Sequence, residues 1–157
     1  MEKLVLPNDV MMDEVARLLA EGHKVVMIPK GRSMLPFIRE GRDKVVLAKP
    51  GTLRVGDIVL AYFGNRYVLH RVIRLEGDQV TLMGDGNLYG TEVGLTNEVA
   101  GVVTEIITSN GRHRKPSRGW LWRKALPIRK YLLKIYRKWN KLRASSRVSR
   151  PEDPRQK

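Results

Sequence analysis

The sequence predicts a mainly β domain with a minor helical part (α+β), flanked by an N-terminal helix and a C-terminal basic amphipathic helix. Two observations predict this fold class. Short β-branched runs alternate with Gly- and Asp-rich turns, which is typical of a β-rich domain. Near the C-terminus, apolar residues recur instead at helical spacing, which indicates a separate element.

The first part of the chain contains one helical pattern followed by strand patterns. In residues 9–21, Met11, Val15, Leu18 and Leu19 fall on one helical face, and Gly22 ends the helix. Six apolar or β-branched runs follow, bounded by turn residues, at 25–28, 45–48, 58–63, 67–73, 79–83 and 99–108. Only three residues separate the third run from the fourth, which predicts a hairpin. We expect these elements to form one domain over residues 1–108.

The C-terminal part divides into three segments by composition. Residues 109–119 are polar and predict a linker. Residues 120–142 hold 13 apolar or aromatic residues, 8 basic residues and no acidic residue, which predicts a basic amphipathic helix that Pro127 bends or interrupts. Residues 143–157 are polar, contain two prolines and predict a disordered tail.

The charge of the chain is unevenly distributed. The formal net charge is +14, but residues 1–100 carry 13 basic and 13 acidic side chains. Residues 101–157 carry 17 basic and 3 acidic side chains, which accounts for the whole excess. The basic character therefore belongs to the C-terminal third and not to the β-rich domain.

The composition also excludes several kinds of chemistry. The chain has no cysteine, so disulfides, thiolate catalysis and Cys-ligated metal centres are excluded, and we expect no metal or other cofactor. The N-terminus lacks the apolar core of a secretory signal, and no apolar run is long enough for a transmembrane helix. We therefore expect a cytoplasmic protein, with the basic helix as a candidate for contact with the inner face of the membrane.

A serine, a histidine and an aspartate, the residue types needed for acyl transfer, occur in or beside the predicted strands and turns. Ser33 follows Gly31 and Arg32 on a turn after a strand, His70 lies late in a strand, and Asp85 lies in a Gly-rich turn. A serine hydroxyl becomes nucleophilic when a histidine removes its proton. A carboxylate behind the histidine fixes the tautomer and stabilises the imidazolium.

Four motifs containing these residues resemble the signal peptidase I and LexA-like serine peptidase superfamily. They occur in the family's order, as Ser33-Met34-x-Pro36, Gly56-Asp57-Ile58-Val59, His70-Arg71-Val72 and Gly84-Asp85-Gly86-Asn87. The pattern is most similar to the ER-type branch with a Ser–His pair, and to its small soluble bacterial relatives. The bacterial signal peptidases and the LexA-type proteins have a lysine where this chain has His70.

The resemblance implies a β-rich peptidase fold with Ser33 as nucleophile and His70 as general base. Two residues are candidates for the acid of the triad. Asp85 matches the first aspartate of the family's acidic motif, and Glu92 is the acidic residue nearest to the position of the family's second aspartate. A substrate peptide would lie extended along strand edges. The resemblance also implies a substrate and oxyanion region that comprises Gly31, Arg32, Met34, Leu35 and Pro36.

We therefore expect a serine endopeptidase that cleaves an extended peptide or a precursor protein. One alternative is a non-catalytic peptide-binding module of the same fold. Another is a cytoplasmic peptidase that processes a ribosomally made peptide precursor, because the chain shows no membrane anchor. A LexA-like self-cleaving regulator is disfavoured, since the first 30 residues contain no Ala-Gly or Cys-Gly dipeptide.

The partner of the basic helix is open at this point. An anionic membrane surface suits its wide apolar stripe, its three tryptophans and its purely basic polar face. The 4-3 spacing of the stripe also fits packing on the protein's own domain or on a partner helix. Binding to nucleic acid would depend only on the positive charge of the helix, and the sequence contains no DNA-binding motif.

Overall fold

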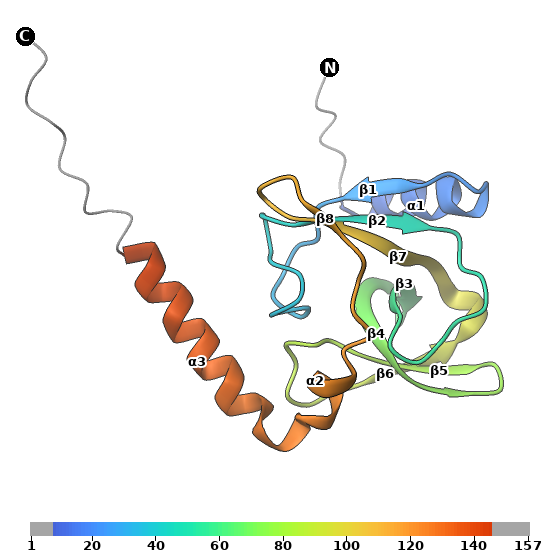
Figure 1. The fold of residues 1–157 in the computed structure, drawn as a ribbon. Coiled ribbons are helices and arrows are strands. Elements are labelled where there is room, and N and C mark those ends of the chain that lie inside the picture. The colour runs from blue at the N-terminus through green and yellow to red at the C-terminus, as the bar shows by residue number, and fades with distance from the viewer. Residues whose placement is uncertain (1–7, 146–157) are drawn as a thin grey trace, which may run out of the picture.

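The computed structural model describes residues 8–145, and within them a single antiparallel sheet of eight strands dominates the fold (Figure 1). The strand order is β1-β2-β7-β3-β4-β5-β6, and β8 pairs with β7. This arrangement confirms the predicted mainly β class with few helices. The elements are α1 (Asn8–Ala20), β1 (Val25–Met27), β2 (Lys44–Ala48), β3 (Ile58–Phe63), β4 (Arg66–Glu76), β5 (Gln79–Met83), β6 (Glu92–Leu95), the 3₁₀ turn η1 (Thr96–Glu98), β7 (Val99–Ile107), β8 (His113–Arg114), α2 (Trp120–Lys124) and α3 (Leu126–Ser145).

The predicted hairpin is confirmed and places His70 in the interior of the sheet. β3 pairs with β4 in antiparallel register, with Val59 opposite His70. Gly64 and Asn65 form the turn with φ angles of 55° and 63°, as a type I′ hairpin requires. On its other side β4 pairs with β5, and Arg71 lies opposite Met83.

The larger part of the core joins α1 and the loop after β1 to one face of the sheet. Its buried residues include Val15 and Leu19 from α1, Met34 and Ile38 from the loop, and residues of β2, β3 and β7. The hydroxyl of Tyr67 donates a 2.9 Å hydrogen bond to Asp13 and so ties α1 to β4. Burial and this hydrogen bond raise the pKa of Tyr67 to about 12.

A second cluster of buried apolar residues lies where the sheet curls and β6 approaches β3. Phe63 is buried in this cluster, and its ring lies against Gly94 of β6. A Cβ atom at Gly94 would come within 2.3 Å of the ring. Only glycine therefore permits this approach, which brings the β6 edge and Glu92 close to the centre of the sheet.

The C-terminal part differs from the sequence prediction in two ways and agrees with it in one. The predicted linker contains β8, which pairs with β7. The helix predicted over 120–142 is interrupted near Pro127, as expected, since α2 ends at Lys124 and α3 begins at Leu126. α3 continues to Ser145, so the first residues of the predicted disordered tail are helical, and the rest of that tail lies outside the described residues. α3 extends away from the sheet (Figure 1).

Candidate active site

The turn that carries Ser33 is held in place by core packing. Met34 and Ile38 are buried in the main core, and the carbonyl of Met34 accepts hydrogen bonds from the N–H groups of Phe37 and Ile38. Gly31 has a φ of 89°, which favours glycine, and its N–H donates to Glu40 at 2.8 Å. The turn therefore presents Ser33 half-buried on a fixed backbone.

The loop after β5 packs directly against the backbone of Ser33. The N–H of Gly86 donates a 2.7 Å hydrogen bond to the carbonyl of Ser33. A Cβ atom at Gly84 would lie 2.5 Å from that same oxygen, and one at Gly86 would lie 2.4 Å from the carbonyl of Arg32. The glycines of the acidic motif are thus required because two loops meet backbone to backbone.

His70 is paired with a carboxylate, and that carboxylate belongs to Glu92. Nδ1 of His70 lies 2.8 Å from Oε2 of Glu92, while the other oxygen accepts a 3.3 Å hydrogen bond from Arg66. The side chain of His70 is 8% exposed and that of Glu92 is 20% exposed. A carboxylate at Nδ1 favours a proton on that nitrogen, so Nε2 can accept a proton.

Asp85 binds a different partner. Its two oxygens accept 2.7 Å hydrogen bonds from Nε and Nη2 of Arg71, and both side chains are buried. Arg71 also donates to the carbonyls of Gly56 and Ser117, and its guanidinium lies over the ring of Phe37. Of the two candidate acids, the structure places Glu92 at His70 and uses Asp85 to neutralise a buried arginine.

The other residues named from the sequence have mixed environments. Met34 belongs to the core, so its side chain does not line a surface pocket. Arg32 and Leu35 border a groove of about 1060 Å³ between the Ser33 loop and α3. Pro36 is half-buried and follows a cis peptide bond. The remaining residues that line the groove are Arg39, Glu40, Arg42, Tyr136, Arg137, Asn140, Lys141 and Arg143.

The sequence did not reveal how the C-terminal segment contacts this region. Nε1 of Trp122 in α2 donates a 2.8 Å hydrogen bond to the carbonyl of Asp85, and its ring packs edge-on against Phe37. Arg129 lies over the Trp122 ring and donates to the Trp122 carbonyl at 2.9 Å. Burial lowers the pKa of the Arg129 guanidinium. The stripe of apolar residues gave no signal for these contacts, because Trp122 and Arg129 lie outside it.

The loop after β5 connects the surroundings of Ser33 with those of His70. Gly84, which contacts the Ser33 carbonyl, directly follows Met83, and Met83 pairs with the neighbour of His70. Among residues 8–145 no hydrogen bond joins the two side chains. The N–H of Ser33 likewise donates to no protein acceptor within that range.

The antiparallel sheet, Ser33 on a Gly-containing turn and the His70–Glu92 pair together are consistent with a peptidase-fold domain. The chain belongs to the family described as Peptidase S24-like, whose model matches residues 4–104. This match confirms the resemblance to the LexA and signal peptidase-like superfamily. No curated protein matches the chain.

Proposed function

We propose that this protein is a serine endopeptidase with Ser33 as nucleophile, His70 as general base and Glu92 as the acid that orients His70. The observation that carries the proposal is the 2.8 Å contact between His70 Nδ1 and Glu92, made beside the loop that fixes Ser33. A histidine held in this way has one nitrogen free for proton transfer, which is what a serine nucleophile needs.

The reaction would proceed through an acyl-enzyme. Oγ of Ser33 attacks the carbonyl carbon of the scissile peptide bond while its proton passes to Nε2 of His70. The carbonyl oxygen becomes an oxyanion, which the N–H of Ser33 stabilises. The tetrahedral intermediate collapses as His70 protonates the leaving amine. A water molecule then gives a proton to His70, attacks the acyl carbon and regenerates Ser33.

The substrate would be an extended peptide or a precursor protein. Within the described chain, β1 and β6 end the sheet and each has one edge that no other strand pairs, so either can add a peptide strand. β1 leads into the Ser33 turn and β6 carries Glu92. The basic residues along the adjoining groove favour acidic side chains in the substrate.

A non-catalytic peptide-binding module is the second candidate. It is favoured by the absence of a hydrogen bond between the Ser33 and His70 side chains in the described residues. Catalytic hydrogen bonds are, however, often long in the free enzyme and tighten only when substrate binds. Cleavage assays distinguish the two functions directly.

The test is to incubate the full-length protein with a proteome-derived peptide library and to identify new termini by mass spectrometry. We expect wild-type protein to produce a consistent set of cleavages, and Ser33→Ala to lower their rate by about a thousandfold or more. Ser109→Ala, at an exposed serine distant in sequence from the motifs, serves as the matched control and should cleave normally. Equal cleavage by Ser33→Ala would refute the proposal, and peptide binding without cleavage by wild type would establish the binding module.

A further inference from the structure

α3 has an apolar face that the domain does not cover. Six large apolar side chains on this helix are between 38% and 61% exposed. At about 100° per residue, they fall within an arc of about 100° around the helix axis. These residues, called here the outer face, are Ile128, Tyr131, Leu132, Ile135, Trp139 and Leu142.

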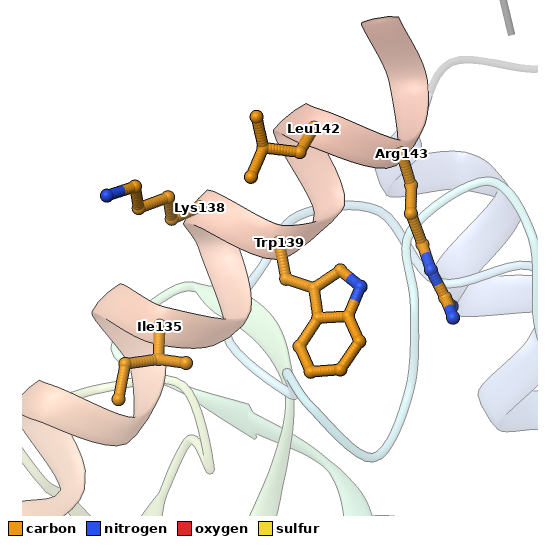
Figure 2. Close-up of a pocket in the computed structure, with 5 residues that line it drawn as sticks. All are labelled: Ile135, Lys138, Trp139, Leu142 and Arg143. Carbon is orange, nitrogen blue, oxygen red and sulfur yellow. The ribbon is translucent and has the colours of Figure 1, made fainter. Parts of the chain in front are cut away.

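A different side of α3 holds the helix to the protein. Arg129 and Leu133 are only 2% and 1% exposed, and both lie outside the arc of the outer face. The outer face is therefore not the surface by which α3 docks on its own domain. A shallow hollow of about 400 Å³ lies on the last turns of this face, lined by Ile135, Lys138, Trp139, Leu142 and Arg143 (Figure 2).

The charge on α3 is of one sign. Seven of its 20 residues are basic and none is acidic. Residues 106–151 contain no acidic side chain, so this segment of the sequence is itself purely basic. Lys138 and Arg143 lie next to the outer face and border the same hollow. An apolar face bordered by basic side chains is complementary to lipid chains below anionic headgroups.

The same charge disfavours a second copy of this chain as the occupant. Pairing two outer faces would bring two copies of α3 together, and each copy carries seven basic residues and no acidic residue of its own. Like charges across a helix interface are destabilising. Nucleic acid would neutralise the charge but leave the exposed apolar side chains in water. No helix within residues 8–145 has the length and apolar character needed to cross a bilayer.

We propose that the outer face of α3 binds an anionic membrane surface, with the helix lying in the plane of the interface. Trp139 and Leu142 insert among the headgroups and upper acyl chains, while Lys138 and Arg143 contact lipid phosphates. Because Trp122 joins α2 to the Asp85 carbonyl, this docking holds the Ser33 and His70 region close to the bilayer. Membrane binding itself does not depend on the proposed peptidase activity.

The experiment measures co-sedimentation of the full-length protein with vesicles of phosphatidylcholine alone or with 30 mol% phosphatidylglycerol, about the proportion that produces a strongly negative surface. We expect binding only to the anionic vesicles, and weaker binding as salt shortens the Debye length. The double variant Trp139→Ser/Leu142→Ser should lower the partition coefficient about tenfold or more, since it removes two exposed apolar anchors. Tyr89→Ser, at an exposed aromatic outside α3, is the matched control and should bind like wild type.

Three results would overturn the proposal. One is equal vesicle binding by the double variant and wild type, which would show that charge alone is responsible. Another is a dimer in solution that Trp139→Ser/Leu142→Ser dissociates, which would identify a second copy as the occupant. The third is absence of binding to the anionic vesicles together with tight, salt-sensitive binding to a DNA duplex. Unchanged thermal unfolding of the variants verifies that each is folded.

Discussion

At the scale of single residues, Asp85 and Glu92 are carboxylates with different surroundings. Asp85 is buried and receives two hydrogen bonds from Arg71, so its charge is offset by a buried partner. Glu92 is partly exposed and divides its two oxygens between His70 and Arg66. Removing a partner from a fully buried pair leaves an uncompensated charge, whereas a pair that water partly reaches contributes less to stability. We therefore expect Asp85 to contribute mainly to the stability of the fold and Glu92 mainly to peptide cleavage.

Replacing each carboxylate by its amide should separate these two roles. Glu92→Gln can donate to Nδ1 of His70 and stabilise the wrong tautomer, so kcat should fall by about 10²- to 10⁴-fold with little change in unfolding. Asp85→Asn should lower the free energy of unfolding by about 3–5 kcal/mol, because Arg71 stays buried without a counter-charge. Cleavage kinetics and urea unfolding provide the two readouts.

Arg66→Gln is the control for the Glu92 variant. It removes the second contact of Glu92 at an exposed site but leaves the His70 contact in place. We expect a small effect on kcat and on stability. If Glu92→Gln cleaved at the wild-type rate while stable Asp85→Asn protein was inactive, the assignment of Glu92 to His70 would have to be reversed.

At the scale of elements, the position of β6 decides which acid reaches His70. β6 reads Glu-Val-Gly-Leu, and its short length, its glycine and its charged first residue gave no strand signal in the sequence. The strands with several β-branched or aromatic residues were predicted, as was the hairpin that holds His70. The spacing of apolar residues indicates which side chains of one segment are buried. It does not indicate which distant strands a curled sheet brings together, so the sequence alone could not decide between Asp85 and Glu92 as the partner of His70.

Gly94 should be necessary for that curl. Gly94→Ala places a Cβ atom 2.3 Å from the buried ring of Phe63, so β6 must move away from β3 and take Glu92 with it. We expect a loss of about 1–3 kcal/mol in the free energy of unfolding. We also expect a decrease in kcat, because the His70 contact lengthens. Urea unfolding and peptide cleavage measure the two effects.

Gly51→Ala is the matched control for this substitution. Gly51 lies between β2 and β3, has no positive φ, and a Cβ atom there would contact nothing within 4 Å. It should therefore be neutral or slightly stabilising. Adding Phe63→Leu to Gly94→Ala should recover part of the lost activity by making room for the methyl group. Equal behaviour of Gly94→Ala and Gly51→Ala would show that the approach of β6 to β3 does not position Glu92.

At the scale of the whole molecule, the C-terminal segment is a basic appendage that also makes hydrogen bonds with the peptidase-fold domain. Arg71 donates a hydrogen bond to the Ser117 carbonyl, and Trp122 donates one to the carbonyl of Asp85. The charge excess at residues 101–157 is predictable by counting residues, but this connection is not, because it depends on one indole N–H and one carbonyl. α2 thus links the loop beside Ser33 to the exposed face of α3.

This link predicts that Trp122 and Trp120 differ in their effects although they lie two residues apart. Trp122→Ala removes the hydrogen bond to Asp85 and the edge contact with Phe37, so the 84–87 loop should open more often. Amide exchange in that loop should accelerate and kcat should fall, while binding to anionic vesicles stays unchanged because the outer face of α3 is intact. Trp120→Ala is the control, since that ring is 56% exposed and contacts Lys124. If the two variants gave the same exchange and cleavage rates, α2 would not support the site.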